Sequence, residues 1–128
     1  MAKLLINAEN KLDAYQIATT EIGTIENKAG DILYYRMIKP SNFDASKKYP
    51  VLNYVYGGPH AQMITNSYLD GANLWMHWMA EQGYLIFTLD NRGSGERGFA
   101  FESGIHRQLG VLEMEDQMTG VDYLKSLP

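Results

Sequence analysis

The sequence contains no cysteine, and this absence removes several classes of protein at once. A chain without cysteine cannot be a disulfide scaffold, cannot use a thiolate nucleophile and cannot bind a metal through sulfur. No apolar run is long enough to span a membrane. The apolar stretch in "MAKLLINAENKLDAYQ" is too short for the core of a signal peptide, so none is expected.

Clustered positive charge is also missing. The 11 Lys and Arg residues are scattered and outnumbered by 15 Asp and Glu, which gives a net charge of -4. Nucleic-acid binding is therefore not expected, because a nucleic-acid backbone requires a basic face. No spacing of His, Asp and Glu indicates a metal site, and no cofactor is expected. With 128 residues, of which 45% are hydrophobic, the chain is long enough for one domain with a core.

Strand and helix patterns alternate along the chain. Two β-rich runs, 19–27 and 31–40, flank the turn sequence "NKAG" and predict an antiparallel hairpin. Further strands are expected at 51–56 and 84–90, helices at 70–83 and 113–127, and an irregular glycine-rich stretch at 91–113. This order predicts an α/β fold, with an opening β-hairpin followed by parallel strands that alternate with helices.

The same patterns predict which side chains face the core. Asp70 is expected to cap the first helix and Gly83 to end it. The strand at 51–56 is largely apolar and is expected to be covered on both faces. His77 is expected at the surface or hydrogen-bonded, rather than as a metal ligand. Core positions are expected at Trp75, Trp78 and the methionines of the first helix, and along a stripe of the second formed by Met114, Met118, Val121 and Leu124.

One glycine-rich stretch, "GSGERG", has the spacing of a dinucleotide-binding motif. Gly93, Gly95 and Gly98 follow a strand, as that motif requires. The motif should open a helix directly from the first parallel strand, whereas "DNR" intervenes here and no clear helical pattern follows. A nucleotide-binding half-domain that uses these glycines is therefore one alternative. A structured loop that needs only a flexible backbone is the other.

A second glycine-rich stretch, "NYVYGGPHAQ", ends a strand abruptly on two glycines and a proline. In α/β-hydrolase folds the loop after the third strand supplies part of the oxyanion hole, the donors that meet the negative oxygen formed when a carbonyl is attacked. Glycines at this point allow a sharp bend and close approach of a substrate. Tyr56 ends the strand, and its hydroxyl is either such a donor or the polar tip of a residue at the edge of the core.

Three blocks of the sequence, in order and spacing, resemble one enzyme family. "YPVLNYVYGGPHAQ", "LDNRGSGERG" and "HRQLGVLEMEDQMTGVDYLKSLP" are similar to the start of the catalytic α/β-hydrolase domain of the dipeptidyl peptidase IV enzymes in the prolyl oligopeptidase family, with the bacterial branch most similar. The resemblance implies that residues 19–128 are the N-terminal portion of this peptidase domain. Residues 1–18 would then be the tail of the preceding β-propeller or a linker.

The resemblance also implies a function. Members of the family are serine exopeptidases that release N-terminal dipeptides from peptides with Pro or Ala at the second position. The tyrosine of their "VYGGP"-like block donates its hydroxyl to the oxyanion, and by motif match this role falls on Tyr56. The family further implies a location in the periplasm or cell envelope of a bacterium.

The sequence departs from the family where the nucleophile is concerned. It contains no Gly-x-Ser-x-Gly, and neither Ser94 nor Ser103 has the required flanks. The three histidines, at 60, 77 and 106, do not match the family's catalytic histidine. The resemblance therefore implies an incomplete domain, truncated before the nucleophile elbow and inactive alone. A small noncatalytic interaction module remains a further alternative.

Charged residues in the matching blocks are expected to be structural. Asp90 and Arg92 are expected to contribute an Arg–carboxylate clamp and loop geometry. A cluster around the last helix is expected to be solvated or ion-paired, and comprises Arg107, Glu113, Glu115 and Asp116. If the hydrolase strand order applies, the strand at 51–56 has an open edge, and a homo-oligomer formed through this edge is expected.

Overall fold

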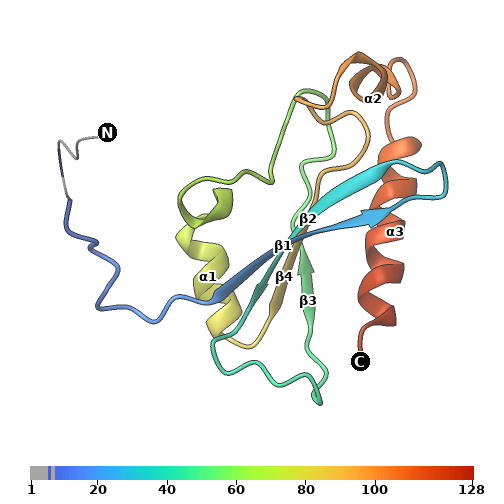
Figure 1. The fold of residues 1–128 in the computed structure, drawn as a ribbon. Coiled ribbons are helices and arrows are strands. Elements are labelled where there is room, and N and C mark those ends of the chain that lie inside the picture. The colour runs from blue at the N-terminus through green and yellow to red at the C-terminus, as the bar shows by residue number, and fades with distance from the viewer. Residues whose placement is uncertain (1–5, 7) are drawn as a thin grey trace.

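The computed structural model of the chain describes Ile6 and residues 8–128. The strands are β1 (Thr19–Glu26), β2 (Ile32–Lys39), β3 (Val51–Asn53) and β4 (Leu85–Leu89). The helices are α1 (Leu74–Glu81), α2 (Phe99–Ser103) and α3 (Leu112–Ser126), with a short 3-10 helix η1 (Tyr68–Gly71) before α1. The predicted α/β fold, a hairpin followed by alternating strands and helices, is confirmed (Figure 1). Of the segment 1–18, the described part holds neither strand nor helix.

The four strands form one mixed sheet in the order β1-β2-β4-β3. β1 and β2 are antiparallel, as predicted, and the turn between them is closed by Asn27, whose side-chain oxygen accepts from the amides of Ala29 and Asp31 at 3.0 and 2.9 Å. Gly30 has the positive φ that such a turn requires, 89°. β4 is antiparallel to β2 and parallel to β3, so it holds the hairpin and the parallel part of the sheet together.

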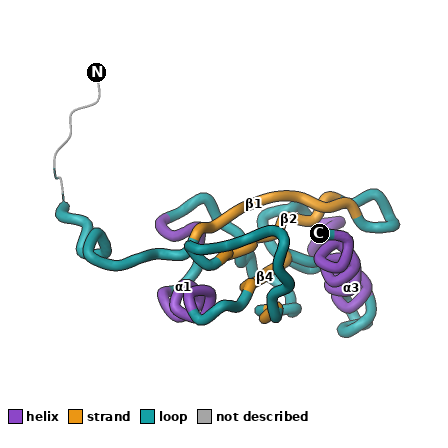
Figure 2. Tube along the Cα trace, turned by 90° about the horizontal axis from the view of Figure 1, so that it is seen from below, coloured by secondary structure: helices purple, strands orange, loops and turns teal. Residues whose placement is uncertain are grey.

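Helices cover the two faces of the sheet, with α1 on one side and α3 on the other (Figure 2). All five residues of β4 are buried, because alternate side chains of this strand point to opposite faces and both faces are covered. One core cluster lies beneath α1 and contains Ala18, Ile38, Met76, Ala80 and Ile86. The other lies toward α3 and contains Leu33, Tyr35, Met37, Phe87 and Leu89. Consecutive residues along β2, and along β4, therefore pack into opposite core clusters.

The start of α1 differs from the prediction. Asn73, not Asp70, is the N-cap, and its side-chain oxygen accepts from the amide of Met76 at 3.0 Å. Asp70 lies in η1, three residues before the N-cap, where it has a φ of 53° and cannot cap the helix. Gly83 does end the helix, as predicted, with a φ of 93° that ordinary residues rarely adopt.

The tryptophans of α1 were expected in the core, and this was wrong. Trp75 is 46% exposed and Trp78 is 57% exposed. The buried residues of the helix are Met76, His77 and Ala80. The short helix contacts the sheet through one narrow stripe, since Met76 and Ala80 are one turn apart, and the larger tryptophans flank that stripe.

The apolar stripe predicted for α3 was also wrong in part. Met114 and Met118 are 59% and 46% exposed. The buried positions are instead Glu113, Asp116, Gln117 and Gly120. Leu124 of the predicted stripe and Tyr123 do pack against the sheet, but the most buried contacts of the helix are polar ones and a glycine, which an apolar period does not detect. At Gly120 a β-carbon would lie 3.0 Å from the ring of Phe87, so the glycine allows close approach.

β3 lies at an edge of the sheet, and the expectation that it is covered on both faces was wrong, because two of its three residues are exposed. Its outer residues are exposed, Val51 to 42%. The amide of Leu85 donates to the carbonyl of Pro50 at 2.9 Å, and the amide of Tyr54 donates to that of Phe87 at 2.8 Å. Even-numbered residues therefore face β4. Since alternate residues of a parallel strand bond to opposite neighbours, the peptide groups of Val51 and Asn53 face the open edge.

Candidate active site

Tyr56 lies beyond the carboxyl end of β3, where the chain turns away from the sheet. Its side chain is 60% exposed, so the ring is not part of the core. Gly57 follows with a φ of 77°. Gly58 lies directly against the ring, because a β-carbon there would stand 3.2 Å from Cε1 of Tyr56. The two glycines thus let the backbone bend under the tyrosine and leave the phenol open to solvent.

The turn after Tyr56 rests on the loop that follows β4. The side-chain amide of Asn91 donates to the carbonyl of Gly57 at 3.4 Å. The backbone amide of His60 donates to the carbonyl of Gly93 at 3.2 Å. His60 has a φ of 66°, which is uncommon for a residue with a side chain and shows that its surroundings determine its conformation.

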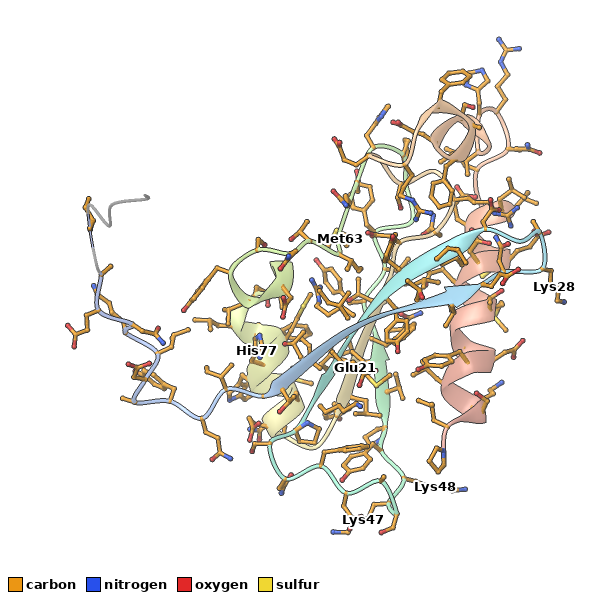
Figure 3. All side chains as sticks on the ribbon, viewed as in Figure 1. Glu21, Lys28, Lys47, Lys48, Met63 and His77 are labelled. Carbon is orange, nitrogen blue, oxygen red and sulfur yellow. The ribbon has the colours of Figure 1, made fainter. Side chains whose placement is uncertain are left out.

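Asp90 fixes the chain a few residues further on. Its two carboxylate oxygens accept from the amides of Met63 and Ile64 at 2.8 and 3.0 Å (Figure 3 labels Met63). Burial raises the pKa of Asp90, and the two amides and the nearby charge of Arg36 oppose this effect. Arg36 is itself buried and donates to the carbonyls of Met63 and Asp70 at 2.9 and 2.7 Å. Its pKa is lowered, chiefly by burial.

The Arg–carboxylate clamp predicted for this loop exists, and its carboxylate is Asp116 of α3. The Arg92 guanidinium donates to both oxygens of Asp116 at 2.8 to 3.1 Å, and the Arg92 backbone amide donates at 2.7 Å. Asn27 of the hairpin turn adds a fourth donor group at 2.9 Å. The hydrogen bond to Asp116 raises the pKa of Arg92. Glu115 also contacts Arg92, at 3.1 Å, whereas Arg107 has no ion pair among the described residues.

Sequence reasoning missed two buried amide side chains beneath the turn. Gln117 donates to the side-chain oxygen of Asn91 at 3.0 Å and to the carbonyl of Leu89 at 3.2 Å. Its own oxygen accepts from Asn53 at 3.3 Å. Asn91 is 2% exposed and Gln117 is 8% exposed. No motif distinguishes these amides in the sequence, because only the fold brings β3, α3 and the loop together.

The glycines of "GSGERG" are explained by packing. Gly93 has a φ of 98°, and a β-carbon there would lie 2.4 Å from Ile105. Gly95 faces the carbonyl of His60, which a β-carbon would approach to 3.1 Å. The helix that follows Gly98, α2, is only five residues long. Two of the three glycines therefore face protein atoms.

The histidines do not converge on one site. His77 is buried between α1 and the start of β1 (Figure 3), where its Nδ1 lies 3.2 Å from the Ala18 carbonyl and its Nε2 has no partner among the described residues. His60 contacts the carboxylate of Glu102 and lines, with His106, a groove of about 850 Å³ beside the turn. In the part of the chain that the structure describes, no group of His, Asp and Glu could hold a metal ion. No helix of that part is long and apolar enough to cross a membrane.

Known proteins that are similar to this chain in sequence or structure are peptidases of one family. A model of the prolyl oligopeptidase family matches residues 72–128. Dipeptidyl peptidase 8 of Mus musculus is 36% identical over 106 residues, which are 83% of this chain and 12% of that protein. A crystal structure of an inferred dipeptidyl aminopeptidase IV from Bacteroides ovatus matches with a TM-score of 0.93 and 53% identity, over 97% of this chain and 18% of that one. Porphyromonas gingivalis dipeptidyl peptidase 4 matches with a TM-score of 0.83 and 34% identity, over 92% and 16%. The chain thus spans less than a fifth of each of these proteins.

Proposed function

Because the chain belongs to the prolyl oligopeptidase family, we propose that it is the part of a serine peptidase in which Tyr56 stabilises the oxyanion. The observation that carries this proposal is the exposed phenol of Tyr56 at the carboxyl end of a parallel strand. Ligands of open α/β sheets bind at that end of the strands. A ring packed into the core could not serve as a donor to a substrate.

The chemistry requires a donor that meets charge as it develops. When a nucleophile attacks a peptide carbonyl, negative charge gathers on the carbonyl oxygen, and a fixed O–H donor stabilises this state more than it stabilises the substrate. The turn supplies the fixed position, since Gly57 and His60 are both hydrogen-bonded to the loop after β4. The sequence contains no Gly-x-Ser-x-Gly, so the proposal places the nucleophile outside these 128 residues and predicts that they do not turn over substrate alone.

We propose that the longer enzyme releases dipeptides from peptide N-termini, because two of the matching proteins are named dipeptidyl peptidases. The preference for Pro or Ala at the second position is the one that the sequence resemblance implies, and it is part of this proposal. The Bacteroides and Porphyromonas matches also support a bacterial source, and we place the enzyme in the periplasm or cell envelope. Detection of its activity in a periplasmic extract checks this location, and activity confined to the cytoplasm contradicts it.

Replacing Tyr56 in the longer peptidase that carries this segment tests the central proposal. Tyr56→Phe removes only the hydroxyl. We expect kcat for a Gly-Pro anilide to fall by about a hundredfold or more, the usual effect of losing one oxyanion donor. Tyr68→Phe is the matched control, since Tyr68 is also exposed, at 71%, and lies in η1 rather than on the turn. An unchanged kcat in Tyr56→Phe would remove this residue from the mechanism.

The open edge of β3 supports a second proposal, that copies of this chain associate. Peptide groups of Val51 and Asn53 face the edge, and a groove of about 710 Å³ lies beside it, lined by apolar side chains of the sheet, of α3 and of the loop before β3, together with four lysines. Unpaired strand edges recruit other strands. We expect light scattering to show a dimer or larger species at micromolar concentration, and Val51→Lys to shift it toward the monomer. A monomeric parent chain would contradict this proposal.

A further inference from the structure

The glycine-rich loop after β4 lies directly beneath the turn that carries Tyr56, and two of its hydrogen bonds hold that turn. We propose that residues 90–95 position the Tyr56 phenol, with Gly95 and Asn91 as the positioning residues. The inference rests on the proposed role of Tyr56. It assigns a structural role to the "GSGERG" glycines, whose spacing otherwise suggests a nucleotide-binding site.

The loop contacts the segment after Tyr56 along its length. Asn91 donates to the Gly57 carbonyl at 3.4 Å, and the Gly93 carbonyl accepts from His60 at 3.2 Å. Asp90 accepts from the amides of the two residues at 63 and 64. These contacts use the backbone of the segment rather than its side chains. The path of the segment therefore depends on the loop.

Gly95 is buried against the same segment. Its φ is not positive, so its backbone conformation does not by itself require glycine. A β-carbon there would nevertheless stand 3.1 Å from the carbonyl oxygen of His60. An alanine at this position must push that carbonyl away by a few tenths of an ångström. Gly95 is thus required by the turn and not by the loop itself.

A displacement of the His60 backbone can move the Tyr56 ring, because few residues separate them. His60 follows Tyr56 by four residues, and Gly58 between them lies against the Tyr56 ring. On the other side, the Gly57 carbonyl is held by Asn91, which Gln117 of α3 fixes in turn at 3.0 Å. The ring therefore lies on a turn that is held at both ends by the loop.

Nuclear magnetic resonance of this chain tests the positioning role without any activity. With carbon-13 in the tyrosine rings, the Tyr56 resonance is the one that disappears in Tyr56→Phe. We expect Gly95→Ala to shift it. Gly104→Ala is the matched control, because Gly104 has an ordinary helical φ of -54° and a β-carbon there would lie 3.4 Å from Leu112, away from the turn. An unmoved Tyr56 resonance in Gly95→Ala, with the other rings unchanged, overturns the inference.

Kinetics of the longer peptidase give the second readout. We expect Gly95→Ala to lower kcat by about tenfold with KM unchanged, since displacements well below 1 Å cost less than the hundredfold expected for a full ångström. Gly104→Ala should leave kcat unchanged. If Gly95→Ala does not fold, Asn91→Ala serves in its place, because it removes the bond to the Gly57 carbonyl.

The two proposals fail in different ways. If Tyr56→Phe retains full turnover, the proposed function fails, while the resonance of Tyr56 in Gly95→Ala still decides the positioning role. If Tyr56→Phe loses turnover but Gly95→Ala and Asn91→Ala keep the parent kcat, the positioning role is overturned and the proposed function stands.

Discussion

The carboxylate of Asp116 offers the most demanding test of how the loop and α3 are held together. It is fully buried and accepts from three donor groups of Arg92 and from the side chain of Asn27. Asp116→Ala would leave the Arg92 guanidinium, only 15% exposed, without its main partner. Removing one partner of a buried ion pair costs about 3–5 kcal/mol. We expect a value of about 3 kcal/mol, because Glu115 still contacts the guanidinium at 3.1 Å and water can reach part of it.

Urea unfolding followed by circular dichroism measures this loss as a change in the free energy of unfolding. Asp116→Asn keeps the shape of the side chain and should cost less, about 1–3 kcal/mol, the range for an imperfectly paired buried group. Glu115→Gln is the control, because Glu115 is 62% exposed and such surface pairs contribute about 0–1 kcal/mol. If Asp116→Ala costs no more than Glu115→Gln, the clamp is not what holds α3 to the loop.

Two further predictions concern α1. Burial lowers the pKa of His77 below its ordinary value of 6.5, so the unfolded chain takes up a proton at a pH where the folded chain does not. We therefore expect the free energy of unfolding to fall as pH decreases below about 6.5, and to fall less in His77→Gln; equal slopes would contradict this reasoning. Met76→Ala should lower the free energy of unfolding by about 2–5 kcal/mol, because Met76 is 2% exposed. Trp78→Ala should lower it clearly less, because Trp78 is 57% exposed. Thermal unfolding that ranks the two variants in the opposite order would contradict this assignment of the buried face.

Local signals predicted the elements of this fold well. "NKAG" between two β-rich runs gave the hairpin, and Gly83 marked the end of α1, because both depend on the conformation of a few neighbouring residues. Faces of helices were predicted less well. Met118 fits an apolar period yet is exposed, whereas Asp116 and Gln117 are buried because they bind groups from distant parts of the chain. A periodicity argument has no access to such partners.

The candidate site divides in the same way. The turn after Tyr56 could be predicted from its glycines, since a turn of this kind is a local property, whereas the role of Tyr56 in catalysis stays a proposal. The clamp of Arg92 could be predicted as a type of contact, but its carboxylate could not be identified, because Asp90 stands nearer in sequence than Asp116. Asn91 and Gln117 could not be predicted at all. Their amides acquire a role only when β3, α3 and the loop meet.

The strand order also constrains the sequence of events during folding. β1 and β2 are joined by a short turn, so they pair locally. Pairing of β4 with β2 requires closure of a long loop, and the chain entropy of this closure is lost before the contacts of β4 can form. Among the strands that the structure describes, β3 pairs only with β4. We therefore expect pulse-labelled hydrogen exchange to show protection in the hairpin before the Tyr54 amide, and the reverse order would contradict this pathway. Arrival of β4 would then be the slow step, after which both helical layers can condense.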